Sequence, residues 1–116
     1  MADLLTDAEA RELCQRVLSH SSADGAEVRV DASNDGNARF ALNQLTTSAD
    51  VHDVGVTVTV RFGSRSAAVT FNGLEDREVA ESVARAERLA QVAPADPELM
   101  PLLPEATYVT VPGFFD

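Results

Sequence analysis

Alternating hydrophobic and polar residues dominate the middle of the chain. In Val54–Phe62 the even-numbered valines and the final phenylalanine fall on one side of an extended backbone. The other side carries Gly55, Thr57, Thr59 and Arg61. A period of two predicts a β-strand with one buried face and one face left for solvent or a partner. Gly63-Ser64-Arg65 is typical of a tight turn, so Ser66–Phe71 is expected to pair with this strand.

Two further strands are predicted upstream. Ala26–Ala32 alternates in the same way, and Asn34-Asp35-Gly36 indicates a hairpin turn because these residues tolerate positive φ. The return strand is expected to carry Ala38, Phe40 and Leu42. Thr46–Asp53 is polar and is interpreted as a loop, which brings the expected number of strands to four.

Helical patterns flank these strands. Thr6 and Glu9 form the signature of a capping box, and a stripe of apolar residues follows from Ala10 to Leu18 at helical spacing. A second helix is predicted over Glu75–Ala93. The sequence therefore predicts an α+β fold, a two-layer sandwich. About four mainly antiparallel strands are flanked by two helices in the order α-β-β-β-β-α. The expected core consists of Val56, Val58 and Val60 packed against Leu13, Val17, Val79 and Val83.

The last part of the chain differs in composition. All five prolines lie between Pro94 and Pro112, among many apolar residues. Proline cannot continue a helix or enter the middle of a sheet, so residues 94–116 are predicted to run extended across a surface. We expect residues 1–93 to form one α/β domain and the proline-rich segment to lead to a further, C-terminal domain.

Charge and composition restrict the function. The 116 residues carry 19 acidic and 9 basic side chains, a net charge of −10, and include no lysine. A nucleic-acid-binding protein needs a cationic surface, and an anionic membrane surface would also repel this chain. One cysteine permits no internal disulfide, and the first residues do not have the pattern of a secretory signal. A cytoplasmic location is therefore expected.

Candidate catalytic groups are few. Asp50, His52 and Asp53 could ligate a metal, although a solvated turn explains the same letters. Cys14 lies on the apolar stripe of the first helix, which favours a small buried side chain over a nucleophile. Ser64 or Ser66 with His52 and Asp53 would supply the letters of a catalytic triad, but no nucleophile elbow is present. The sequence predicts no catalytic, cofactor-binding or metal-binding residue.

The polar side of the strands is a more informative candidate. Its side chains are small and largely uncharged, which suits either an exposed sheet face or a surface covered by a further domain or partner subunit. The apolar end of the chain adds to this surface. The residues of this candidate interface are Arg39, Ala41, Asn43, Thr57, Thr59, Arg61, Phe114 and Phe115.

Several stretches resemble one known family. They are LLTDAEARELCQRVL, RFALNQLTTSADV with its Asn43-Gln44, the valine strand ending in RFG, and LAQVAPADPELMPLLP. Together they resemble the N-terminal domain of the TldD/PmbA family, modulators of DNA gyrase that are regarded as metallopeptidases. The resemblance implies an α/β domain followed by a β-rich C-terminal domain that holds zinc, where zinc is present, through a His-Glu-x-x-x-His helix and a cysteine. His20 and His52 do not fit that motif, so no zinc ligand is carried over to this chain.

The resemblance implies a noncatalytic N-terminal domain that scaffolds the peptidase domain, forms the dimer and helps to enclose a cleft for unfolded peptides. Its expected partners are its own C-terminal domain, a TldD- or PmbA-like subunit and the peptide substrate. Two other functions remain open from the residues alone. One is a free-standing acidic α/β interaction module, and the other is a small hydrolase that uses the Asp50–Asp53 loop.

Overall fold

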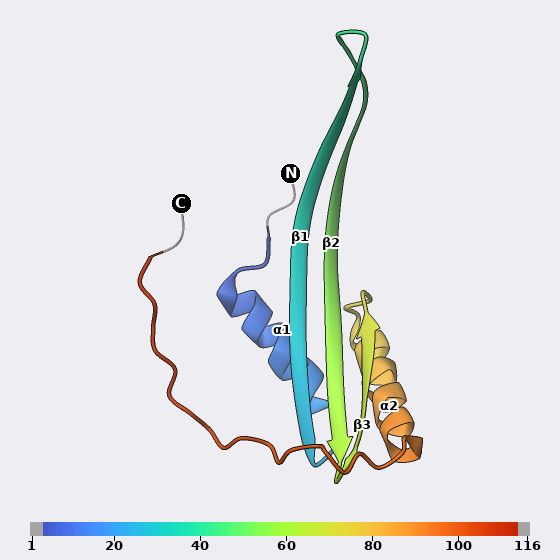
Figure 1. Ribbon diagram of the computed structural model, residues 1–116, viewed down its shortest axis with the longest axis vertical. Coiled ribbons are helices and arrows are strands. Elements are labelled where there is room, and N and C mark those ends of the chain that lie inside the picture. The colour runs from blue at the N-terminus through green and yellow to red at the C-terminus, as the bar shows by residue number, and fades with distance from the viewer. Residues whose placement is uncertain (1–3, 114–116) are drawn as a thin grey trace.

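The computed structural model describes residues 4–113 as two helices and a three-stranded antiparallel sheet. The elements follow one another as α1 (Asp7–Ser19), β1 (Gly25–Ala41), β2 (Gln44–Phe62), β3 (Arg65–Phe71) and α2 (Asp76–Val92). The sheet order is β1-β2-β3, and both helices pack against the same face of the sheet (Figure 1). The predicted α+β class with two helices is therefore confirmed.

Both helices begin and end where the sequence indicates. The capping box of α1 is formed: the Glu9 amide donates to Thr6 Oγ1 at 3.3 Å, and the Thr6 amide donates to Glu9 Oε2 at 2.8 Å. The Thr6 amide and, secondarily, the Thr6 hydroxyl donate to the Glu9 carboxylate and lower its pKa. The α2 helix ends at Val92, directly before Ala93-Pro94, because the residue before a proline disfavours helical backbone.

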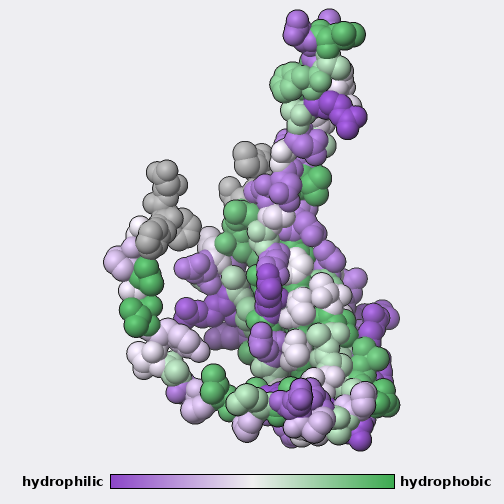
Figure 2. All heavy atoms as spheres, in the orientation of Figure 1, coloured by the Kyte–Doolittle hydropathy of each residue, from purple (hydrophilic) through white to green (hydrophobic). Residues whose placement is uncertain are grey.

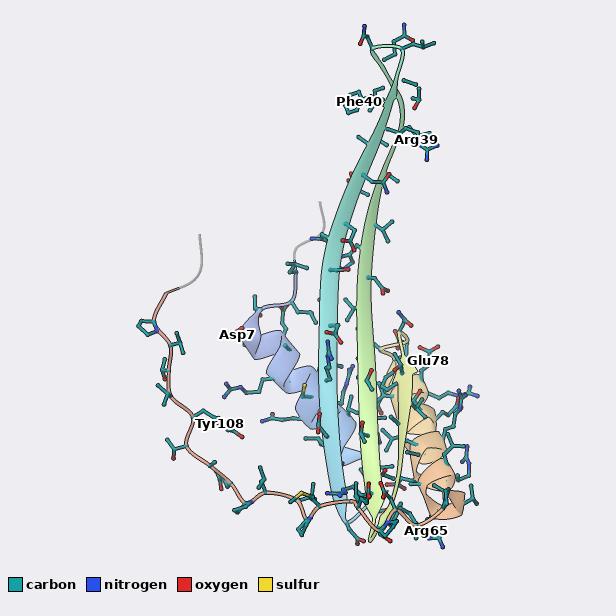
Figure 3. The ribbon with its side chains drawn as sticks, viewed as in Figure 1. Asp7, Arg39, Phe40, Arg65, Glu78 and Tyr108 are labelled. Carbon is teal, nitrogen blue, oxygen red and sulfur yellow. The ribbon has the colours of Figure 1, made fainter. Side chains whose placement is uncertain are left out.

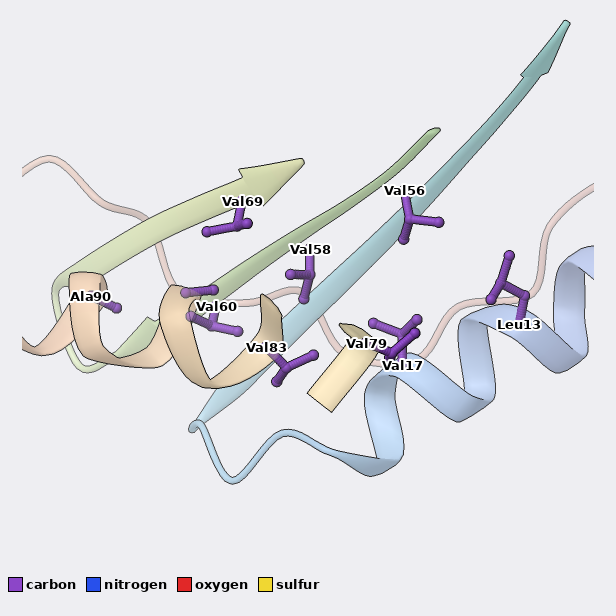
Figure 4. Packing of buried hydrophobic residues seen from close by; sticks show 10 residues of the cluster. Leu13, Val17, Val56, Val58, Val60, Val69, Val79, Val83 and Ala90 are labelled. Carbon is purple, nitrogen blue, oxygen red and sulfur yellow. The ribbon is translucent and has the colours of Figure 1, made fainter. Parts of the chain in front are cut away.

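The core lies between the helices and β2. Val56, Val58 and Val60 are fully buried, as predicted (Figure 4). The threonines between them lie on the other face of the sheet, since side chains alternate along a strand. Each buried valine contributes about 1.5–3 kcal/mol of transfer free energy. The side chains that enclose these valines come from both helices and β3: Leu13, Val17, Val69, Val79, Val83, Ala86 and Ala90.

The predicted hairpin turn at Asn34-Asp35-Gly36 is wrong. These residues lie inside β1 and pair with His52, Val51 and Asp50 of β2. The chain turns instead at Leu42-Asn43, where φ is 51° and 57°. Two consecutive positive φ values are typical of a type I′ turn, the two-residue connection that suits the twist of a hairpin. The sheet therefore has three strands rather than four, and the predicted loop Thr46–Asp53 is part of β2.

The β1–β2 hairpin extends far beyond the core. The last residue of β3 pairs with Val56, whereas the β1–β2 ladder continues from Asp31–Gly55 to Ala41–Gln44. We call residues 31–55 the arm. Above its base, where Ala32, Asn34, Val54 and Gly55 are half-buried, it stands clear of both helices and of β3 (Figure 1). The arm accounts for the elongated shape, with extents of 59 × 36 × 30 Å and a radius of gyration of 18.7 Å. A compact chain of this length would have a radius of about 13 Å.

Residues 94–113 form no helix or strand, but their first part is anchored to the sheet. The Asp96 amide donates to the Ser64 carbonyl at 2.8 Å, and the Arg61 guanidinium donates to the Met100 carbonyl at 2.7 Å. Arg65 donates to the Ala93 carbonyl. We call residues 93–102 the strap, since they cross the end of the sheet remote from the arm tip (Figure 1).

Candidate interaction surfaces

The sheet leaves one face without a covering layer of helices, and we call it the open face. Thr57 lies between Arg29 and Thr70 on neighbouring strands, and Thr59 lies between Glu27 and Ala68. The hydroxyls of Thr57 and Thr70 are 2.8 Å apart and hydrogen-bond across the strands. The centre of this face therefore presents small, largely uncharged groups, as the alternation in the sequence predicts.

Several charged groups around the open face have partners within the chain, while Glu27 beside Thr59 is a further charge on this face. The Arg29 guanidinium lies 2.8 Å from Asp31 Oδ1, and this contact raises the pKa of Arg29. Arg61 is held by the Met100 carbonyl. The Asn72 amide donates to Asp53 Oδ1 at 2.9 Å. These bonds reduce the cost of covering Arg29, Arg61 and Asp53, because a partner would not have to strip water from these charges while they are unpaired.

The strap closes over one end of the open face and leaves a hollow beneath it. The hollow has a volume of about 290 Å³. Its floor includes Thr59, Arg61 and Ser66, and its apolar wall includes Leu99, Met100 and Leu102. At the edge, Leu102 lies so close to buried Gly25 that a Cβ there would meet Leu102 Cδ1 at 2.2 Å. Glycine is needed here because the strap approaches the backbone of β1 closely.

The residues predicted as one interface lie in separate places. Thr57, Thr59 and Arg61 belong to the open face, whereas Arg39, Ala41 and Asn43 lie at the far end of the arm (Figure 3). Phe114 and Phe115 lie outside the described residues. Arg39 and Ala41 were expected on a short return strand beside the core. They belong instead to the last pairs of the long β1–β2 ladder, far from Thr57 and Thr59.

Sequence reasoning missed the apolar character of the arm tip. The exposed fractions of Phe40, Leu42 and Leu45 are 73%, 97% and 56%. Figure 2 shows hydrophobic residues at the end of the arm. Leu42 also has a φ of 51°, a backbone region in which glycine or asparagine is the usual residue. The sequence does indicate this apolar tip, because three large apolar residues lie within the six positions around the turn.

The candidate catalytic groups do not converge. Consecutive residues of a strand point to opposite faces, so His52 and Asp53 are separated. His52 contacts Asn34 across the ladder, while Asp53 accepts a hydrogen bond from Asn72. Ser64 lies in the β2–β3 turn, about 40 Å along β2 from His52. Within residues 4–113 no three His, Cys, Asp or Glu side chains are placed to hold a metal ion, so these donors do not fit a zinc site.

Cys14 is partly exposed rather than fully buried, on a helix whose buried residues are Leu13 and Val17.

Neither helix has the length and apolar character needed to cross a membrane within the part of the chain that is described.

Comparisons with known proteins agree with the fold. Residues 26–90, which are more than half of the 116, match the family model described as PmbA/TldA metallopeptidase domain 1. The structure is similar to the crystal structure of TldE from Thermococcus kodakarensis, with a TM-score of 0.71 and 18% sequence identity over 89% of this chain. This chain spans only 23% of that protein. A search among curated protein sequences gives no match.

Proposed function

This chain belongs to the PmbA/TldA metallopeptidase family, of which it carries domain 1, and from this premise we propose that it is a noncatalytic scaffolding domain. It would support a peptidase domain, take part in the dimer and form one wall of a cleft for unfolded peptides. Its partners would be its own second domain and a TldD- or PmbA-like subunit in the cytoplasm. Zinc, where the protein uses it, would be held by the second domain.

The open face carries this proposal. A two-layer fold buries one side of its sheet against helices, and the other side normally carries scattered charges in contact with water. Here the centre of that side consists of threonine, serine and alanine side chains, while Arg29 beside it is paired with Asp31 and Asp53 accepts a hydrogen bond from Asn72. Interfaces are depleted in charge at their centre in the same way. The open face therefore suits contact with another domain.

The strap supports the same function. It crosses the edge of the open face, is fixed there through Arg61 and Ser64, and adds apolar side chains to this surface. The hollow of about 290 Å³ beneath the strap combines an apolar wall with threonine and arginine groups. Pockets with this mixture accept side chains of a ligand, and we assign the hollow to the wall of the peptide cleft.

The test is the affinity of the chain for its separately produced second domain, measured by isothermal titration calorimetry. Ala68→Arg places a bulky cation on the exposed part of the open face and should weaken binding at least tenfold. Ala8→Arg, the same change at an exposed alanine of α1, should leave binding unchanged. Equal effects of the two variants, or no binding by the unaltered chain, would contradict the proposal.

The noncatalytic character has a separate test. The chain alone should hydrolyse no peptide and retain no stoichiometric zinc, because its histidines lie apart and have other contacts. One tightly held zinc per chain that is lost on His52→Ala would instead support a small hydrolase. The remaining alternative is an acidic interaction module, suggested by the net charge of −10, and it would bind basic proteins with strong salt dependence.

A further inference from the structure

We propose that the arm tip of one chain docks into a groove beside α1 of a second copy, and that the second arm docks reciprocally. This inference rests on the proposed function only in expecting the chain to take part in a dimer. We define the tip as residues 38–47. The α1 groove has a volume of about 250 Å³ and is lined by Leu5, Glu9, Glu12, Leu13, Arg16 and Leu74.

The arm has no packing surface within its own fold. Its strands pair only with each other beyond Val56, and the side chains from Asp35 to Asp53 are all exposed. A two-stranded hairpin without a packed face is at best marginally stable in water. The turn adds backbone strain, because Leu42 occupies a left-handed conformation that costs less for glycine or asparagine. An exposed leucine at a strained turn is understandable if its side chain inserts into a partner.

The groove matches the tip in polarity and charge. Between Gly36 and Ala49 the only ionisable side chain is Arg39, although the whole chain carries a net charge of −10. The floor of the groove is formed by Leu5, Leu13 and Leu74, and its rim carries Glu9 and Glu12. The cation in the groove, Arg16, is held by the Leu74 carbonyl at 2.7 Å. Phe40 and Leu42 would cover the leucines, and Arg39 would lie near the acidic rim.

The geometry favours a second copy over the arm's own groove. The arm extends beyond the helices (Figure 1), and its strands place the base of the tip about 30 Å, and the turn about 43 Å, beyond the end of β3. A paired ribbon of this length cannot fold back to reach α1 of the same chain. Reciprocal docking of two arms gives a closed twofold dimer in which both tips and both grooves are used.

The experiment is sedimentation velocity on the 116-residue chain. We expect a dimer with a micromolar dissociation constant. Leu42→Asp should weaken it at least tenfold, while Leu103→Asp should not. Leu103 is a suitable control because its exposed fraction is 92%, close to the 97% of Leu42, and it lies in the tail. A strictly monomeric chain, or equal effects of the two variants, would overturn the proposal.

Charge exchange identifies the docking site. Arg39→Glu and Glu12→Arg should each weaken the dimer, and the double variant should recover most of the affinity if the two side chains meet. If the double variant raises the dissociation constant of the dimer by the product of the two single effects, the two side chains do not meet. That result would rule out this groove. Because both residues are exposed, circular dichroism should report an unchanged fold.

The result is distinguishable from failure of the proposed function. Loss of the dimer in Leu42→Asp with unchanged affinity for the second domain would support the docking and leave the scaffolding role intact. A dimer that is dissolved by the second domain but insensitive to Leu42→Asp would refute the docking alone. In that case the open face, and not the arm, would form the contact between copies.

Discussion

Replacing Val58 by aspartate is the most demanding test of the assigned faces of the sheet. Val58 is fully buried, pairs with Val28 on one side and Val69 on the other, and faces both helices. Removing this side chain from the core costs about 2 kcal/mol. The new carboxylate has no partner there, which adds several kcal/mol if it stays charged. A total of about 5 kcal/mol is comparable with the whole stability of many domains, 5–15 kcal/mol.

The adjacent residue supplies the control. Thr57→Asp changes the open face, where it removes the Thr57–Thr70 hydrogen bond at a cost of about 1 kcal/mol. Arg29 pairs with position 57 across the ladder and would compensate part of that loss. The two variants thus make the same chemical change one residue apart, on opposite faces of the sheet.

Urea unfolding followed by circular dichroism distinguishes the outcomes. With a slope of about 2 kcal/mol per M, Val58→Asp should lower the midpoint by about 2.5 M and Thr57→Asp by at most about 0.5 M. Burial should raise the pKa of the carboxyl in Val58→Asp above that of the unfolded chain. The loss in free energy of unfolding caused by Val58→Asp should therefore grow as the pH rises from the pKa of the unfolded chain to the pKa of the folded chain. Equal midpoint shifts for the two variants would refute the assignment of the faces.

Three further predictions concern the turn, the strap and the helix cap. Leu42→Gly should raise the thermal midpoint of unfolding, because it relieves about 1 kcal/mol of strain in the left-handed backbone at this position. The same change should weaken self-association. A lower thermal midpoint would contradict the strained turn. Gly25→Ala should displace the Leu102 side chain and increase proteolysis of the strap with little change in stability; unaltered proteolysis would argue against this contact. The hydrogen bonds from Thr6 lower the pKa of Glu9, so they contribute stability above its unfolded pKa. That contribution should vanish as the pH falls through the lowered pKa, and Thr6→Ala should reduce this part of the pH dependence of unfolding.

The packed half of the fold is predictable from sequence because burial leaves a periodic signal. The valines of β2 alternate with threonines since one face meets the helices, and the capping box and Pro94 mark helix boundaries. The Gly63-Ser64 turn is likewise found where glycine permits the positive φ of 57°. Each of these features is determined by local chemistry or by a single buried face.

The arm was not predictable by the same reasoning. Both of its faces are exposed, so Thr46–Asp53 has no hydrophobic alternation and its sequence is typical of a loop. Every residue of this segment except Thr46, which lies at a bulge, is nevertheless paired with β1. Asn34-Asp35-Gly36 tolerates a turn but does not require one, and the ladder with β2 continues through it. The true turn contains a leucine, which local propensity disfavours at positive φ. The interface residues on the arm were consequently assigned to the wrong part of the fold.

Hydrogen–deuterium exchange of the chain with and without its second domain tests the scaffolding role most directly. We expect slower exchange in Thr57–Arg61, in β3 and in the strap, because the second domain would cover the open face. Exchange in the solvent-facing side of α2 should not change. Protection confined to the helices, or no protection anywhere at concentrations that saturate binding, would contradict the role assigned to the open face.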